Sequence, residues 1–284
     1  MVAAALLAFT APAHAEDSDV VAVADDDGRD PESGDVLPRE RGWVEVSAFL
    51  PNVDTRLRID EQGGPVGTEI DFESDLRLSR RKVLPAVSAG VWLSRNWALF
   101  GEFYEVSRSQ NTTLSEEIVF DGEVFPANAD VTGRFGSQIF RLGVRHSLHR
   151  DANTEIDLSL GAHVTAFEAG IEGEIQAGNT AAQTARRRRE VLAPLPTLGL
   201  YMRQEVAPRV DLSLQADAFR IELGDVEGRI VNFQATASYR LGRSFALGLA
   251  YRQIDYRLTV DKDDWSGRAK YGFSGPAVSL RYTW

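Results

Sequence analysis

The chain has 284 residues, 43% of them apolar, with 42 acidic against 31 basic side chains and a formal net charge of -11. It contains no cysteine, which excludes disulfides and cysteine-ligated zinc or iron–sulfur centres. The acidic balance argues against a nucleic-acid partner, because such proteins usually carry a basic surface. An apolar fraction of this size is sufficient for a folded structure but identifies no activity.

The first residues indicate export. Residues 3–9 form a short apolar run, and Ala13-His14-Ala15 supplies a small-residue cleavage site after Ala15. We therefore expect residues 1–15 to be a secretory signal peptide, the alternative being a frayed apolar N-terminus. The run is too short to cross a bilayer as a helix, and a stretch of ~18 consecutive apolar residues occurs nowhere else.

Residues 16–41 are strongly acidic, with ten carboxylates against three arginines. Low hydrophobicity combined with high net charge predicts a disordered leader, which we expect on the periplasmic side. Residues 25–28 resemble a calcium loop only faintly, since Val23 and Gly34 stand where carboxylates are required. No metal site is therefore predicted.

Alternation with a period of two begins at Trp43 and runs to the end of the chain. In one stretch, Val210, Leu212 and Leu214 interleave with Asp211 and Ser213. This pattern is typical of a strand with one polar and one apolar face. Ten such segments are expected, at roughly 43–59, 70–94, 97–120, 131–149, 154–172, 191–206, 209–224, 229–242, 244–260 and 266–284.

The connections between these segments alternate between two kinds. Tight connections lie at about 94–96, 149–153, 206–209 and 241–244, and mostly longer, more polar ones lie at about 60–69, 107–130, 172–191, 224–229 and 260–267. An even strand number, with both termini on the side of the short turns, is typical of an outer-membrane barrel. Eight strands would follow if the flanks of the second and third long loops were misassigned.

A soluble two-sheet sandwich also alternates apolar and polar positions, but it buries the apolar face that a barrel turns toward lipid. Aromatic placement favours the barrel, because indole rings prefer the headgroup layer. Four tryptophans fall at strand ends on the short-turn side: Trp43, Trp92, Trp97 and Trp284. Trp43 and Trp92 have inward parity and could instead belong to the barrel mouth, and a second girdle could include Tyr104, Tyr256 and Tyr271.

The last strand carries a further signal. It ends in an aromatic residue preceded by apolar side chains at alternate positions: Val278, Leu280, Tyr282 and Trp284. This resembles the C-terminal assembly signal of bacterial outer-membrane barrels. The resemblance implies an all-β, closed, antiparallel up-and-down transmembrane barrel over residues 42–284. It also implies a Gram-negative outer membrane, recognition by the barrel assembly machinery, contact with outer-membrane lipid and lipopolysaccharide, and a monomer.

If the apolar positions face lipid, charged and polar residues of both signs face the lumen. The predicted lumen network is Glu45, Glu102, Arg141, Arg145, Asp157, His163, Arg203, Asp211, Asp217, Arg240, Arg252 and Arg281, with Tyr201 beside it. A ten-stranded barrel has little interior space, so these side chains should pair across it. The result is either a self-satisfied polar plug or a narrow, arginine-lined pore that favours anions.

Catalysis is not predicted. After the signal peptide only His146, His149 and His163 remain, and the first two lie beside a short turn. None is near an outer loop, where ten-stranded omptin proteases carry paired aspartates and an aspartate–histidine couple. His163 is expected to partner a carboxylate, Asp157 or Asp211. We expect no cofactor; the alternative function is a barrel enzyme acting on lipid or peptide.

Two outer loops offer candidate contacts. Arg186, Arg187, Arg188 and Arg189 are predicted in the third loop, where four guanidiniums could bind lipopolysaccharide phosphates or simply form a solvated charge run. The second loop mixes acids with apolar residues and is expected to project as a hairpin. The predicted role is accordingly structural, surface-interacting or that of a narrow channel.

Overall fold

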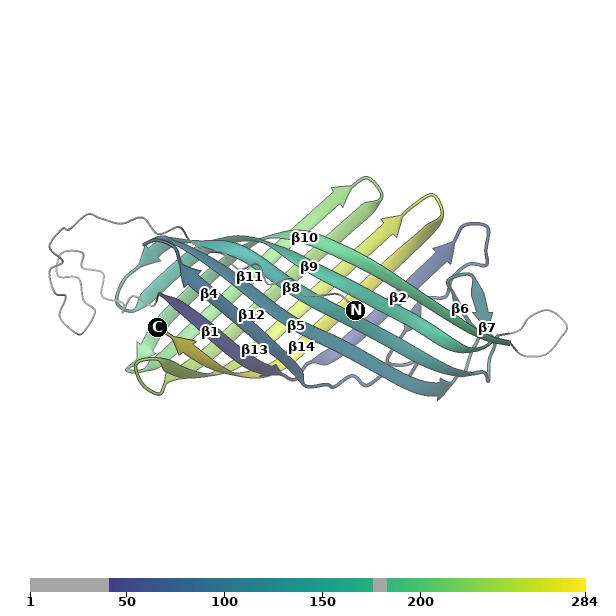
Figure 1. Ribbon diagram of the computed structural model, residues 1–284, viewed down its shortest axis with the longest axis horizontal. Helices are drawn as coiled ribbons and strands as arrows, with labels where there is room; N and C mark the ends of the chain where they lie inside the picture. The colour runs from purple at the N-terminus through teal and green to yellow at the C-terminus, as the bar shows by residue number, and fades with distance from the viewer. Residues whose placement is uncertain (1–40, 176–182) are drawn as a thin grey trace, which may run out of the picture.

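The structure, a computed structural model, describes residues 41–175 and 183–284 and consists almost wholly of antiparallel strands (Figure 1). The predicted signal peptide and all but the last residue of the predicted leader lie outside these ranges. Within them, no helix is long and apolar enough to cross a membrane. The strands are β1 (Gly42–Phe49), β2 (Asn52–Glu61), β3 (Ile70–Asp71), β4 (Leu84–Trp92), β5 (Trp97–Thr113), β6 (Ile118–Phe120), β7 (Glu123–Phe125), β8 (Asp130–Arg150), β9 (Thr154–Ile175), β10 (Gln183–Ala207), β11 (Val210–Leu223), β12 (Val226–Arg240), β13 (Phe245–Asp261) and β14 (Trp265–Thr283).

The wall closes into a barrel of ten strands when β1 and β2 are taken as one strand interrupted at Leu50-Pro51. β14 pairs with β1 over Ala277–Thr283 and with β2 over Trp265–Ser274. The ring continues from β1 through β4, β5 and β8 to β14, each strand beside its neighbour in sequence. The predicted up-and-down barrel is confirmed, and the eight-stranded alternative is excluded.

Three predicted segments differ from the structure. The strand expected over 70–94 is regular only in β4, the strand expected over 97–120 ends at Thr113, and the strand expected from 191 begins at Gln183. The prediction of longer outer loops holds for residues 62–83 and 114–129, whereas two residues join β11 to β12 and three join β13 to β14. Sequence patterning gives element type more reliably than element ends.

The tight turns gather at one end of the barrel, called here the short-turn end; the opposite end is the long-loop end. In the turn between β8 and β9, the Asp151 carboxylate accepts hydrogen bonds from the backbone N–H groups of Asn153 and Thr154, both at 2.8 Å. These bonds stabilise the charged carboxylate and lower the pKa of Asp151. The aspartate thereby fixes the local backbone of the turn.

Strand β13 shows how the two faces of the wall exchange character along their length. Near the short-turn end its outward side chains are apolar and 45%, 62% and 52% exposed: Leu247, Leu249 and Tyr251. Beyond Arg252 the outward residues are polar: Gln253, Asp255 and Arg257 are exposed, and Thr259 is half-buried. The inward residues of that second half are apolar and buried: Ile254, Tyr256, Leu258 and Val260.

The same exchange occurs on β8. Its outward residues are Phe140, Leu142 and Val144 toward the short-turn end, and Thr132, Arg134 and Gln138 toward the long-loop end. No register shift interrupts the pairing of β8 with β9 between these groups. A wall that passes from hydrocarbon into water without changing register must exchange its faces in this way, since apolar side chains avoid water on either side.

The short-turn half therefore has the outer face of a membrane-spanning wall. Leu158, Leu212 and Phe233 are 41%, 46% and 42% exposed there, so they do not form the centre of a soluble core. Trp97 and Trp284 lie on the same outer surface, both nearly half exposed, as an aromatic girdle requires. Trp43 and Trp92 instead face the lumen, where arginines lie over their rings.

The long-loop half is closed by an apolar core inside the barrel. Tyr104, Tyr256 and Tyr271 belong to this core, with exposures of 1%, 3% and 2%, so their predicted place in an outer girdle is wrong. The outer face is already polar at their level, and the interior is the only apolar surrounding available to their rings. An apolar core of this kind is typical of a water-exposed β-structure.

Substitutions on one strand should locate the boundary of the hydrocarbon. We expect Leu249→Arg to destabilise the folded barrel by roughly 2–4 kcal/mol, because it places a charge on the lipid face. Gln253→Arg, on the same face two outward positions further along, should change stability by less than about 0.5 kcal/mol, because that site is in water. Urea titrations in lipid vesicles, read on heat-modifiability gels, measure both. Equal costs for the two variants would contradict the proposed boundary.

Candidate functional site

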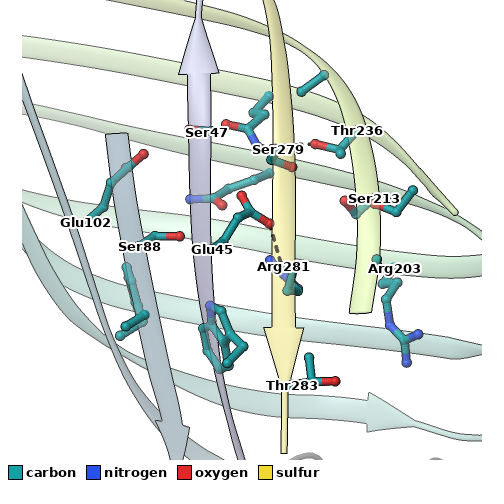
Figure 2. A pocket seen from close by; sticks show the side chains of 18 of the residues that line it. Glu45, Ser47, Ser88, Glu102, Arg203, Ser213, Thr236, Ser279, Arg281 and Thr283 are labelled. Carbon is teal, nitrogen blue, oxygen red and sulfur yellow. Dashed lines mark hydrogen bonds and ion pairs between the residues drawn. The ribbon is translucent and has the colours of Figure 1, made fainter. Parts of the chain in front are cut away.

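All twelve predicted lumen residues face the interior of the short-turn half. Nine of them line a cavity with about 1590 Å³ of space between its atoms, the open mouth included: Glu45, Glu102, Arg141, Arg145, Arg203, Asp211, Arg240, Arg252 and Arg281. Figure 2 shows Glu45 on β1 hydrogen-bonded to Arg281 on the neighbouring strand β14, with several serine and threonine hydroxyls around them. The cavity reaches the short-turn end, where Gly242, Arg243 and Thr283 line it.

The inner end of the cavity is closed by a cluster drawn from five strands. Arg252 on β13 binds Glu102 on β5 through both carboxylate oxygens, at 2.5 and 3.0 Å. Arg141 on β8 donates to Asp217 on β11 and lies 3.9 Å from Glu102. Asn232 on β12 donates to Asp217 at 2.8 Å. Bidentate, charge-assisted bonds of this kind hold the lumen side chains in one arrangement.

A second network lies nearer the short-turn end. Asp211 accepts from Arg203 at 3.0 Å and lies 3.4 Å from Arg240, which also pairs with Glu205 at 2.5 Å. Glu155 pairs with Arg150 and lies 3.5 Å from Arg203. The sequence prediction missed Arg150, because a register shift between Ser147 and His149 changes the face on which later residues of β8 point.

The histidines lie in three different surroundings. His163 is 1% exposed, packs edge-on against Tyr256, and its Nε2 has no hydrogen-bond partner in the described part of the chain. Its predicted carboxylate partners are not engaged with it, since Asp211 binds arginines and neither Asp157 oxygen is hydrogen-bonded. His146 packs against Trp97 on the outer wall, and His149 contacts Asp151 in the short turn.

An aromatic layer lies directly above the charged cluster. Tyr271 contacts Phe273 and Phe135 at ring distances of 4.3 and 4.9 Å, and Phe167 contacts Tyr256 at 5.8 Å. Two hydroxyls inside this layer are satisfied, Tyr271 with Ser137 at 2.8 Å and Tyr256 with Thr165 at 2.6 Å. The hydroxyl of Tyr104, in the same core, has no hydrogen-bond partner among the described residues. The close packing of the rings leaves little room for water.

The wall of the long-loop half contains a gap that an irregular segment fills. Because β4 begins only at Leu84, the upper part of β5 pairs with β8 alone. Residues 72–83 lie beside β2 in place of a regular strand, with Leu76 and Leu78 buried. A buried ion pair between Arg108 of β5 and Glu73 of this segment links the two sides, and Glu73 also accepts from the backbone of Thr55 on β2.

The sequence predicted that the second loop projects as a hairpin. The β6–β7 hairpin forms, but it covers the apolar core, since Phe120 and Phe125 are completely buried. Two of the predicted loop arginines hold it in place. Arg187 pairs with Glu123, and Arg189 pairs with Asp121 at 2.5 Å. The hairpin thereby closes the barrel over its aromatic layer.

The four-arginine run lies in strand β10 and not in a loop. Alternation along the strand divides the run between two faces. Arg186 and Arg188 share the outer face with Glu172, Glu168 and Glu190, at 3.7, 2.8 and 2.8 Å. Arg187 and Arg189 share the inner face with the hairpin acids. Each of the four guanidiniums therefore already has a carboxylate partner.

The predicted assembly residues lie together on the outer surface of the barrel seam. Val278, Leu280, Tyr282 and Trp284 are all outward and 39–51% exposed. Tyr282 stacks with Trp284 at 5.8 Å, and the Trp284 carbonyl accepts from the backbone N–H of Arg41 at 2.5 Å. In the described ranges, no three acidic or histidine side chains are grouped closely enough to hold a metal ion.

The chain matches no protein-family model and no curated protein. It is similar in structure to the outer membrane protease OmpT from Escherichia coli, with a TM-score of 0.60 and 12% identity over 89% of this chain and 100% of that one. Weaker likenesses are the toluene transporter TodX of Pseudomonas putida (TM-score 0.35, 10% identity, 87% and 91% covered) and the attachment invasion locus protein Ail of Yersinia pestis (0.28, 11%, 84% and 99%). The fold is that of a bacterial outer-membrane β-barrel.

The charged cluster should be strongly coupled. We expect Glu102→Gln to destabilise the barrel by about 3–5 kcal/mol, because it leaves Arg252 as an uncompensated buried charge. The double variant Glu102→Gln with Arg252→Gln should cost clearly less than the sum of the two single variants. Arg220→Gln removes the exposed Arg220–Glu227 pair and, as a control, should cost less than about 1 kcal/mol. If denaturant titrations show that the double variant loses as much stability as the two single variants together, the Glu102 and Arg252 side chains are not energetically coupled.

Proposed function

We propose that the protein is a closed, non-catalytic outer-membrane barrel that presents a water-exposed β-structure at the cell surface. The proposal rests on three successive layers of side chains that block the interior of the barrel. The charged cluster around Glu102 and Arg252 comes first, and the aromatic layer and the β6–β7 hairpin follow. In this orientation the short turns face the periplasm and the long-loop half stands outside the cell.

Strand length supports a surface role. About 9–11 residues suffice for a tilted strand to cross the hydrocarbon. β8, β9 and β10 have 21, 22 and 25 residues, so roughly half of each is not needed for spanning. The excess lies in the half whose exterior is polar and whose interior is apolar. A protein that needed only a membrane anchor would gain nothing from ordering these additional residues.

The arginine-lined pore is the less favoured role. Ions need a continuous path of water or polar ligands, and dehydration in an apolar layer is costly. The arginines of the lumen are mostly committed to carboxylates, as with Arg141 and Asp217. A plug is therefore the better explanation of the lumen charges. Histidine placement likewise supports a non-catalytic role, since His163 is fully enclosed between the charged cluster and the aromatic layer.

Lipopolysaccharide contact is proposed for the outward members of the arginine run only. Arg186 and Arg188 lie on the outer face, just beyond Leu192, which is 65% exposed. This places their guanidiniums at the level where headgroup phosphates would begin. Phosphate would have to compete with Glu168 and Glu172, so each contact should be modest in strength. Arg187 and Arg189 are proposed to hold the hairpin.

Planar-bilayer recording tests the closed state. Folded protein, verified by heat-modifiability, should give no ohmic single-channel steps, because the aromatic layer interrupts any water path. A general porin inserted into the same bilayers serves as the control for reconstitution. Reproducible steps from the folded protein would contradict the plug and restore the channel.

Paired substitutions test the division of the arginine run. The double variant Arg186→Gln with Arg188→Gln should co-purify with less lipopolysaccharide, measured as bound phosphate, and should keep its hairpin protected from protease. The double variant Arg187→Gln with Arg189→Gln should retain lipopolysaccharide but become cleavable between Leu114 and Ala129. Unchanged lipopolysaccharide retention in the first variant, or an equal loss in the second, would remove the outer pair as a lipopolysaccharide site.

A further inference from the structure

Arg145 differs from the other arginines of the lumen. It is 9% exposed, yet no carboxylate of the described residues lies within ion-pair distance of it, and its side chain donates no hydrogen bond there. Its nitrogens make no hydrogen bond within the described ranges but are not fully enclosed by protein atoms, so they remain in contact with the cavity that they line. Arg243, which also lines the cavity, is exposed at its mouth. The remaining inward arginines of this half pair with acids: Arg141, Arg150, Arg203, Arg240, Arg252 and Arg281.

Three aromatic rings hold the Arg145 guanidinium in place. Its Cζ atom lies 4.3 Å from the ring centre of Tyr201, 5.0 Å from Phe100 and 5.5 Å from Trp43. Cation–π contacts offset part of the cost of burying the charge, but they leave the N–H donors in the guanidinium plane unused. A buried cation with free donors is expected to take an anionic partner. Asp157, on the neighbouring strand, does not line the cavity and makes no ion pair with Arg145.

The cavity around Arg145 is suited to a small anion. Each carboxylate that lines it is already matched: Glu45 by Arg281, Glu102 by Arg252, Glu155 by Arg150, and Asp211 by Arg203. Ser88, Ser213, Thr236 and Ser279 add hydroxyl donors to the same walls (Figure 2). The cavity opens at the short-turn end and ends blindly at the charged cluster, so a ligand must enter and leave through one mouth.

We propose that this cavity, called the vestibule below, is a binding site for a small oxyanion, a carboxylate or a phosphate. Arg145 is its principal ligand-binding residue. The planar guanidinium presents paired donors that match two oxygens of a carboxylate or phosphate. The aromatic rings fix the orientation of that fork before the anion arrives, which lowers the entropy lost on binding. The site faces the compartment at the short turns and is separate from the surface role of the long-loop half.

Titration of the folded wild-type barrel in detergent tests the site, with sodium acetate and sodium phosphate as probes at an ionic strength held constant with chloride. Trp43 and Trp92 line the cavity and should report binding as a saturable change in fluorescence. At least one probe should saturate, and which one does distinguishes a carboxylate from a phosphate site. Arg145→Gln should weaken its binding about tenfold or more, as expected for the loss of charge-assisted hydrogen bonds. Arg257→Gln removes an exposed arginine from the outer face and should bind like the wild type.

Arginine modification gives a second measurement that needs no variant. Phenylglyoxal should modify Arg145 in the wild-type protein, and the bound probe should protect it, as judged by peptide mass mapping, while modification of Arg257 is unchanged. The proposal is overturned if neither probe saturates, if Arg145→Gln binds as tightly as the wild type, or if Arg145 is unreactive or unprotected. Should Arg145→Gln fail to fold, the protection pattern alone decides.

Discussion

The structure depends on one geometrical constraint: side chains of a strand alternate between two faces, and that alternation continues unchanged while the surroundings change from hydrocarbon to water. Apolar side chains must therefore move from the outer to the inner face at the boundary. On β14 the outward residues Leu280 and Val278 belong to the first environment, and the inward residues Phe273 and Tyr271 belong to the second. A polar lumen below an apolar core follows directly from this exchange.

The boundary between the two interiors explains why the charges next to the apolar layer are paired. Glu102, Arg141 and Arg252 stand two residues from Tyr104, Ile139 and Ile254 on their own strands, so the charged cluster touches the apolar layer. Proximity to that layer lowers the local dielectric, which strengthens each ion pair and raises the cost of an unmatched charge. The bidentate bond between Arg252 and Glu102 is the arrangement that such a setting favours.

Much of the barrel could be predicted from the sequence, because alternation, turn composition and the C-terminal aromatic residue are local signals. The exchange of faces was also present in the sequence, as a change from odd apolar positions at Leu247 and Leu249 to even ones at Ile254 and Tyr256 with no bulge between them. A single lipid-facing rule for the whole strand does not predict it. The filling of the wall by residues 72–83 could not be predicted, because it depends on a contact between Glu73 and Arg108 that no local pattern encodes.

The arginines show how position on a face, more than sequence proximity, decides what a charge does. The run at 186–189 suggests one basic patch, but alternation assigns its members to different partners, and acids distant in sequence, such as Asp121 and Glu123, neutralise the inner pair. Arg145 is isolated in the sequence, yet the fold leaves it as a lumen guanidinium with aromatic neighbours in place of a carboxylate. Because the aromatic layer separates the vestibule from the hairpin, an anion held at Arg145 can influence the long-loop half only through the strands that the two share.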